Sequence, residues 1–131
     1  MFNHVMVGSN DIARSKEFYN ALLATLGVGE PVTNVTAGGA TRLFYLHPEG
    51  LFCVSEPIDG EAATIANGAT IGFKCNSPEQ VKIFHDVAVA NGGTSIEDPP
   101  GLRQAGLGPM HLAYMRDPDG HKLCAIYRVP A

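Results

Sequence analysis

The sequence contains one pattern twice. Residues 2–27 align with residues 68–93 without a gap. Further along, HPEG at 47–50 matches DPDG at 117–120, after an insertion of four residues in the second copy. A repeated supersecondary unit cannot bury its apolar face alone, and it needs a neighbour to complete a core. The duplication therefore predicts two related units that pack together, with a cup between them as the place for chemistry.

Size and composition predict one compact domain. The chain has 131 residues, 45% of them hydrophobic, so we expect a single domain over 1–131 with modules at 1–57 and 68–128. A net charge of −4 argues against a nucleic-acid partner, which would need a basic face. We expect no membrane contact, since no apolar stretch approaches the roughly 20 residues that span a bilayer. The start of the chain lacks a signal-peptide pattern, and its three cysteines without a CxxC pair favour reduced thiols and a cytoplasmic location.

Each copy predicts the element order β-α-β-β-β. Short apolar runs with β-branched residues open both copies. Apolar residues at helical spacing follow them and predict helices near 12–26 and 78–91, packed outside a curved sheet. Ser77 and Pro78 supply a capping residue and a first-turn proline for the second helix. Residues 98–109 are rich in glycine and proline, and we expect them to form a mobile loop.

The two turns predict which side chains share a face of each sheet. If two residues connect the strands at each turn, Cys124 pairs with Ala113 and His111 pairs with Ile126. His111 and Cys124 would then lie on one face, and His121 would point to the opposite face and be exposed to solvent. In the first copy, the corresponding face would hold Thr41, Leu43, Tyr45, Phe52, Val54 and Glu56.

Several motifs occur in a characteristic order. They are a strand with His4, D-x-x-x-S-x-x-F-Y at 11–19, L-L-x-x-L-G at 22–27, PG-x-R at 100–103 and R-DPDG at 116–120. With this order and the duplication, the chain resembles the vicinal oxygen chelate superfamily, which includes glyoxalase I, extradiol dioxygenases, and bleomycin and fosfomycin resistance proteins. The resemblance implies an α+β fold of two βαβββ modules that form an open curved barrel, and it implies a homodimer.

The resemblance also implies where a metal would bind. The family holds its metal with residues from the first and last strands of each module, which fall here at His4, Val54, Thr70 and Cys124. Only His4 is a standard ligand, and hard divalent cations prefer carboxylate and water oxygens. Zinc bound by His4, Cys124 and His111 stays an alternative. A metal-free pocket without a cofactor is the favoured interpretation.

A small-molecule pocket is expected where the candidate side chains converge. Arg103 is a candidate for holding a carboxylate or phosphate, or equally for packing within its loop, and His85 is expected to make a surface or helix–sheet contact. No catalytic residue is assigned. Two functions stay open: an enzyme related to lactoylglutathione lyase, isomerases or dioxygenases, and a metal-free protein that sequesters a small molecule or antibiotic. The ligand-binding candidates are His4, Thr70, His111, Cys124, Tyr45, Phe73 and Arg103, with Leu43, Val54 and Met115 as further walls.

Overall fold

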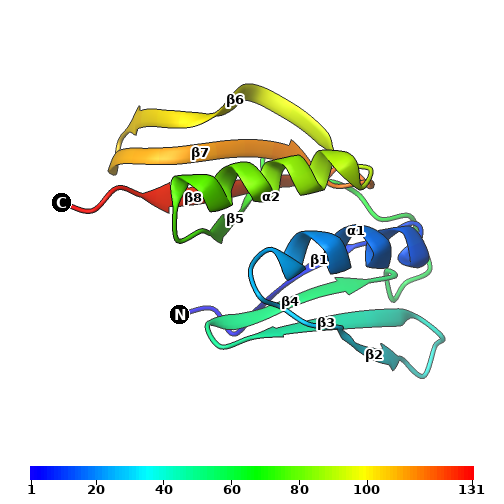
Figure 1. Cartoon of the computed structure of the whole chain (residues 1–131). Helices are drawn as coiled ribbons and strands as arrows, with labels where there is room; N and C mark the ends of the chain where they lie inside the picture. The colour runs from blue at the N-terminus through cyan, green and yellow to red at the C-terminus, as the bar shows by residue number, and fades with distance from the viewer.

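The computed structural model describes residues 1–131, apart from the side chain of Ala105. Eight strands and two helices make up the described chain (Figure 1). Within it, no helix is long and apolar enough to cross a membrane. The elements are β1 (His4–Gly8), α1 (Ile12–Ala24), β2 (Val32–Val35), β3 (Thr41–His47), β4 (Gly50–Ser55), β5 (Ile71–Lys74), α2 (Pro78–Ala90), β6 (Thr94–Ala105), β7 (Gly108–Arg116) and β8 (Lys122–Arg128).

The strands form two open four-stranded sheets with the same topology. Their orders are β1-β4-β3-β2 and β5-β8-β7-β6. The pairs β1–β4 and β5–β8 are parallel, and the other pairs are antiparallel. This repetition of a mixed sheet with one helix per copy confirms the predicted α+β fold of two βαβββ modules.

The helices begin where the capping residues predict. The side chain of Asp11 accepts a hydrogen bond from the N–H of Arg14 at the start of α1. The side chain of Ser77 does the same for the N–H of Gln80 at the start of α2. Each bond satisfies one of the backbone donors that a helix N-terminus leaves without a partner, so local sequence alone fixes both helix starts.

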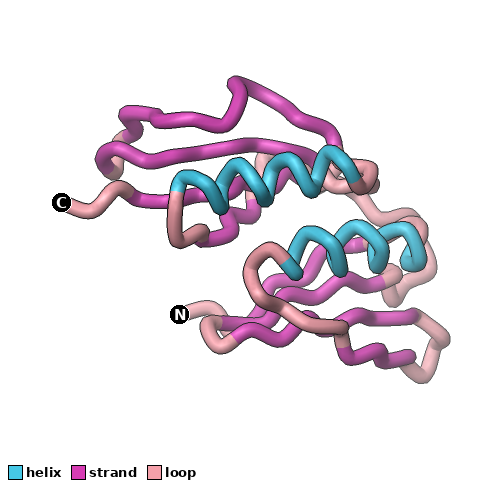
Figure 2. The backbone as a smooth tube through the Cα atoms, in the orientation of Figure 1, coloured by secondary structure: helices cyan, strands magenta, loops and turns pink.

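Each helix covers one face of its own sheet, and the two helices contact each other between the sheets (Figure 2). A row of aromatic rings links the layers. The ring of Tyr19 on α1 lies 4.9 Å from that of Phe52 on β4, and Phe52 lies 5.3 Å from Phe73 on β5. Phe73 in turn lies 5.3 Å from Phe84 on α2. The apolar core is therefore continuous through both halves, as the duplication requires.

The register of the first hairpin agrees with the prediction, but the role of its face does not. Leu43 pairs with Val54, and Tyr45 pairs with Phe52. All four side chains are buried in the main core, because α1 covers this face. Leu43 and Val54 are thus core residues, rather than walls of an open cup, and the same holds for Met115 in the second half.

The predicted register of the second hairpin is wrong by one residue. Cys124 pairs with Tyr114, and His111 pairs with Tyr127. His111 and Cys124 consequently lie on opposite faces of the sheet. The cause is Asp117, whose Oδ1 accepts hydrogen bonds from the N–H groups of Asp119 and His121 and so stabilises a wider turn than the two-residue turn of the first copy.

Residues 98–109 form the second part of β6, a two-residue turn at 106–107 and the start of β7, rather than the mobile loop that their composition suggested. β6 runs through both prolines and pairs with β7, with a register shift between Ile96 and Gly101. It is an edge strand, where a missing N–H donor is tolerated. A bulge on an edge strand thus accommodates the proline pair without ending the pairing.

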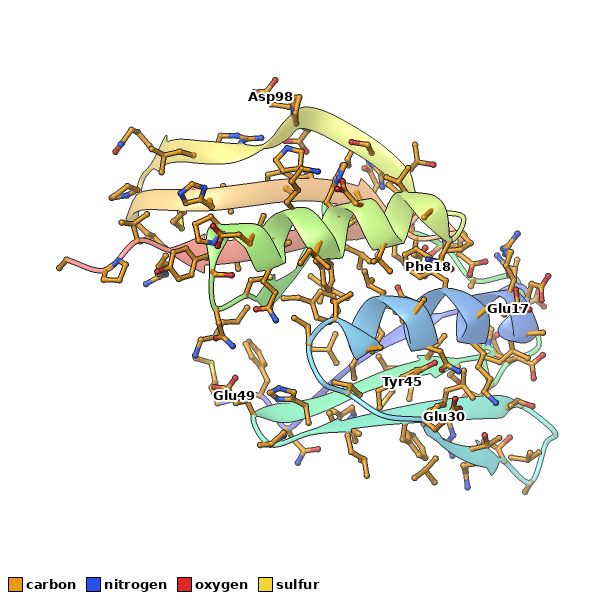
Figure 3. All side chains as sticks on the ribbon, viewed as in Figure 1. Glu17, Phe18, Glu30, Tyr45, Glu49 and Asp98 are labelled. Carbon is orange, nitrogen blue, oxygen red and sulfur yellow. The ribbon has the colours of Figure 1, made fainter. Side chains whose placement is uncertain are left out.

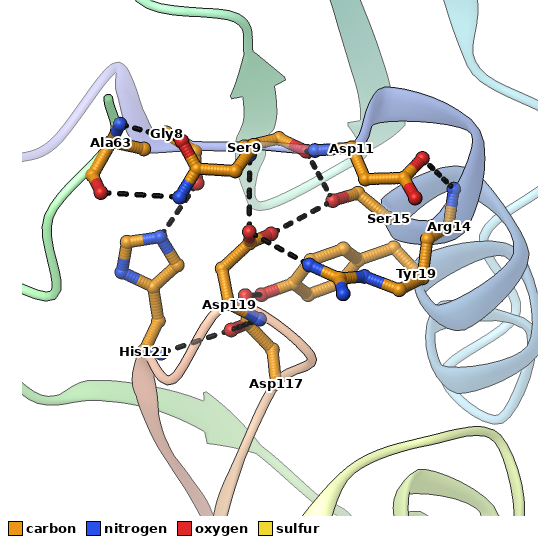
Figure 4. Close-up of polar contacts among 11 residues, drawn as sticks. Gly8, Ser9, Asp11, Arg14, Ser15, Tyr19, Ala63, Asp117, Asp119 and His121 are labelled. Atoms are coloured by element: carbon orange, nitrogen blue, oxygen red, sulfur yellow. Dashed lines mark hydrogen bonds and ion pairs between the residues drawn. The ribbon is translucent and has the colours of Figure 1, made fainter. Parts of the chain in front are cut away.

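The second turn binds the start of the first helix through Asp119 (Figure 4). Its carboxylate accepts hydrogen bonds from the N–H of Asn10 at 3.0 Å, the guanidinium of Arg14 at 3.0 Å and the hydroxyl of Ser15 at 3.1 Å. The side chain of Asp119 is only 3% exposed, so this carboxylate is well shielded from water. The contact joins the two halves at the N-terminal end of α1.

Two further bonds strengthen the same junction. The buried Tyr19 hydroxyl donates to Asp117 Oδ2 over 2.5 Å, and His121 Nε2 lies 2.6 Å from the carbonyl oxygen of Gly8. Since a carbonyl oxygen only accepts, His121 carries its proton on Nε2 in this contact. The prediction that His121 is exposed was wrong, because the backbone of Gly8 in the first half packs against its ring and leaves the residue only 7% exposed.

Candidate functional site

A cleft of about 230 Å³ opens between the two halves, next to the C-terminal turn of α1. Three of the predicted site residues, His4, Tyr45 and Phe73, line it. Leu26 on the α1 side and Ile71 on the β5 side complete opposite walls. The walls are mostly apolar, which is the usual character of small-molecule sites.

The mouth of the cleft is polar. Lys74 Nζ lies 3.4 Å from Glu49 Oε2 across the opening, and both side chains are well exposed. Figure 3 shows Glu49 at the tip of the β3–β4 turn. His4 and His47 lie at the same rim, with His4 Nδ1 2.8 Å from the side-chain oxygen of Asn3. An exposed ion pair of this kind is weak, so the Lys74 ammonium can exchange Glu49 for an anion at low cost.

Tyr45 contributes an uncharged wall. Its hydroxyl donates to Asn20 Oδ1 over 2.7 Å. Burial raises the pKa of the Tyr45 phenol far above its ordinary value, and the nearby carboxylate of Glu30 raises it further. The phenol therefore stays neutral under physiological conditions and acts as an apolar surface with a satisfied hydroxyl.

Cys124 lies outside this cleft, on the face of the second sheet that no helix covers. Burial raises the pKa of its thiol, and the hydrogen bond from Tyr114 and the charge of Lys122 only partly offset this effect. The thiol is therefore protonated at neutral pH, whereas a nucleophile or metal ligand must be a thiolate. The side chains packed around Cys124 are Met110, Leu112, Tyr114 and Ile126.

His111 and Thr70 are separate from both places. The half-buried His111 lies on the helix side of β7 and lines a second hollow with Pro78, Pro99 and Pro100. Thr70 precedes β5 and is exposed. The predicted convergence of His4, Thr70, His111 and Cys124 on one cavity is therefore wrong. The register of the second hairpin separates His111 from Cys124, and Thr70 is exposed at the start of β5.

Arg103 is occupied by backbone acceptors. Its guanidinium donates to the carbonyl oxygens of Gly101 at 2.9 Å, Asp98 at 3.0 Å and Pro99 at 2.9 Å. These bonds hold the bulge of β6 in place. Of the two alternatives that the sequence left open, the geometry favours packing within the segment over anion binding.

The structure also changes one of the positions that the family resemblance assigned. Cys53 pairs with Phe44 on the first sheet as Cys124 pairs with Tyr114 on the second, and Phe44 and Tyr114 are equivalent in the two copies. Cys53, rather than the fully buried Val54, is thus the counterpart of Cys124. The extra residue in the second turn hid this equivalence.

The donor set of one chain does not fit a metal. In the described part of the chain, no three His, Cys, Asp or Glu side chains come together. The zinc alternative required His4, Cys124 and His111 to converge, but Cys124 and His111 lie on opposite faces of β7 and β8. His4 belongs to the other sheet, so one chain offers no three-ligand site.

Comparison with known proteins identifies the family. The model of the Glyoxalase/Bleomycin resistance protein/Dioxygenase superfamily matches residues 1–125. The chain belongs to this superfamily, as the motif order and the duplicated βαβββ topology predicted. No curated protein sequence matches the chain.

Several solved structures are similar to the chain. A glyoxalase/bleomycin resistance protein from Albidiferax ferrireducens T118 is 52% identical, with a TM-score of 0.91, over 98% of this chain and 99% of that one. The manganese-bound fosfomycin resistance protein FosX from Listeria monocytogenes shares 15% identity and a TM-score of 0.70, covering 98% and 93%. Glyoxalase I from Zea mays shares 19% identity and a TM-score of 0.73, covering 94% of this chain and 45% of that one. The last two show likeness of fold alone.

Proposed function

We propose that the chain binds a small, largely apolar organic molecule in the cleft between its two halves, without a metal. The observation that supports this function is the cleft itself, with apolar walls from Leu26, Phe52 and Phe73 and charged side chains confined to the mouth. Such a cavity removes apolar ligand surface from water, worth about 25 cal/mol per Å², and orients the ligand through its few polar groups.

An acidic group on the ligand would suit the mouth. Lys74 is an exposed cation there, and His4 and His47 add imidazoles. FosX is described in complex with a dihydroxypropylphosphonic acid, an example of an acidic ligand on this fold. The proposed ligand therefore has an apolar body within the cleft and a carboxylate, phosphonate or similar group beside Lys74.

An enzyme of the lyase or dioxygenase type is the second candidate function. The glyoxalase I fold neighbour and the imidazole of His4 at the cleft favour it. If the chain is such an enzyme, a metal would have to be completed by residues from a second chain, because one chain does not supply three ligands. Metal content therefore discriminates between the two functions.

We further propose that the protein is a homodimer in the cytoplasm. The first sheet has one face that no helix covers, and Met6, Val32 and Leu46 on this face are 42%, 52% and 63% exposed. Apolar side chains gathered on one face of a sheet are typical of an association surface. A second copy is the commonest partner for such a surface.

Binding of an apolar fluorescent acid, anilinonaphthalene sulfonate, tests the proposed site. Leu26→Trp puts a larger side chain into the cleft and should weaken binding by at least about tenfold, since overpacking and lost contacts together exceed 1.4 kcal/mol. Leu102→Trp, at an exposed position on β6, is the matched control and should bind as the wild type does. Equal affinity in both variants would exclude the cleft.

A further inference from the structure

A histidine on α2 connects a serine hydroxyl to a carboxylate. His85 Nε2 lies 2.8 Å from Ser95 Oγ at the start of β6, and His85 Nδ1 lies 2.9 Å from Asp86 Oδ1. This is the helix–sheet contact that the sequence predicted for His85. The contact joins α2 to β6, and neither of these elements lines the cleft.

The direction of these hydrogen bonds follows from the groups involved. An ionised carboxylate only accepts, so Nδ1 of a neutral His85 must carry the proton and donate it to Asp86. Nε2 is then the unprotonated nitrogen, and the Ser95 hydroxyl donates to it. A serine that donates to an imidazole oriented by a carboxylate is the arrangement that activates a serine nucleophile.

The surroundings keep this arrangement in place. The His85 side chain is only 12% exposed, so its ring has little freedom to turn away. The ammonium of Lys82 donates to Asp86 Oδ2, and this bond, with a smaller contribution from His85, lowers the pKa of the Asp86 carboxyl. Asp86 therefore remains ionised at neutral pH while Ser95 stays open to solvent.

A hollow of about 400 Å³ adjoins the carboxylate end of the constellation. It lies between α2 and β6, and both Lys82 and Asp86 line it. Its other walls are mainly apolar, with Val81 and Pro100 among them. A short apolar chain fits such a hollow, beside Asp86, and the ring of His85 connects this carboxylate to the Ser95 hydroxyl.

We propose that Ser95 is a nucleophile, that His85 is its general base, and that the pair accepts acyl groups from small esters with short apolar acyl chains. Ser95 Oγ attacks the ester carbonyl carbon, and its proton passes to His85 Nε2. The bond from that carbon to the alcohol oxygen breaks, and His85 returns the proton to the departing alcohol. Water then hydrolyses the acyl-serine with His85 as base, and the acid leaves. Asp86 is a positioning residue for His85.

Acylation by p-nitrophenyl butyrate tests this proposal in the intact protein. Release of nitrophenolate should accompany transfer of one butyryl group to Ser95, located by peptide mass spectrometry and removable by hydroxylamine as an ester is. His85→Gln should slow this acylation on the order of 100-fold, the typical contribution of a general base. Ser95→Ala should abolish the ester adduct. Thr94→Ala removes the neighbouring hydroxyl on the same strand and should change nothing.

A separate measurement distinguishes a positioning role of Asp86 from a structural one. Asp86→Asn should slow acylation, and Asp86→Glu should restore part of the rate. If Asp86 only made a structural contact with Lys82, neither substitution would change the acylation rate in this way. Thermal unfolding of each variant verifies that it folds. Butyryl groups on lysines alone, or a rate in His85→Gln equal to that of the wild type, would overturn the proposal.

Discussion

Tyr19 couples the first helix to the turn of the other copy through a single hydroxyl. Its partner, Asp117, is buried and lies in a junction that also includes Asp119 and His121. Burial and the neighbouring carboxylate of Asp117 raise the pKa of the Tyr19 phenol well above its ordinary value, so the hydroxyl keeps its proton. In this bond a neutral hydroxyl donates to a carboxylate, and such hydrogen bonds are stronger than those between two neutral groups.

We predict that Tyr19→Phe lowers the free energy of unfolding by about 1.5–3 kcal/mol, the range for hydrogen bonds to charged groups. Tyr45→Phe is the matched comparison, because its hydroxyl donates to the neutral amide oxygen of Asn20, and it should cost about 1 kcal/mol. Urea unfolding of both variants measures the difference. A smaller loss in Tyr19→Phe than in Tyr45→Phe would contradict this account of the junction.

At the scale of elements, the connection from α2 to β6 depends on a glycine. A Cβ added to Gly93 would lie 2.7 Å from the carbonyl oxygen of Ala88, 2.9 Å from that of Arg116 and 2.9 Å from the ring of Phe18. Two of these neighbours are backbone atoms, which cannot move aside as a side chain can. The close approach of helix, strand and α1 ring therefore requires a residue without a side chain.

Gly93→Ala should accordingly destabilise the protein by about 3 kcal/mol, the upper part of the range for overpacking. Gly72→Ala provides the control, since a Cβ there meets nothing within 4 Å and the change should stay within about 0.5 kcal/mol. Thermal or urea unfolding distinguishes the two. Similar stability of both variants would show that the α2–β6 connection relaxes more easily than its geometry indicates.

The elements themselves could be predicted from the sequence, because their signals are local. Capping by Asp11 and Ser77, and the helical spacing that followed, gave both helices within a few residues of their observed ends. The register of the second hairpin could not be predicted in the same way. It depends on a side chain, Asp117, that accepts two bonds within its own turn, and a shift of one residue moves every side chain of a strand to the other face.

At the scale of the whole molecule, that shift explains why the predicted site was only partly right. His4, Tyr45 and Phe73 do share a cleft, since none of them depends on the register of the second hairpin. The family resemblance assigned Cys124, the register placed His111 beside it, and neither residue joins them. The polar rim at His47 and Lys74 was missed, because it arises from how the two halves meet, which no local pattern encodes.

Metal content provides a prediction at this scale. One chain lacks three converging ligands, so we expect no stoichiometric Mg²⁺, Mn²⁺, Fe²⁺ or Zn²⁺ in protein purified without chelator. Elemental analysis by mass spectrometry measures this directly. About one ion per chain that disappears in His4→Ala would instead indicate the enzymatic function, with a site shared between chains.

The proposed homodimer depends on the uncovered face of the first sheet. Leu46→Lys places a charge on this face, where burial without a partner is costly, and should shift the protein towards monomer in sedimentation equilibrium. Ile58→Lys, at a more exposed apolar residue between the two halves of the sequence, should leave the assembly unchanged. A monomeric wild type, or dissociation by both variants alike, would be inconsistent with association through this face.

The position of a bound ligand tests the central claim most directly. Amide chemical shifts of isotope-labelled protein, titrated with anilinonaphthalene sulfonate, report binding residue by residue in a chain of 13.9 kDa. We predict that the largest shifts occur at Leu26, Ile71 and Phe73, which line the cleft. Shifts concentrated at Tyr114 and Cys124 on the uncovered face of the second sheet, with the cleft residues unchanged, would contradict it.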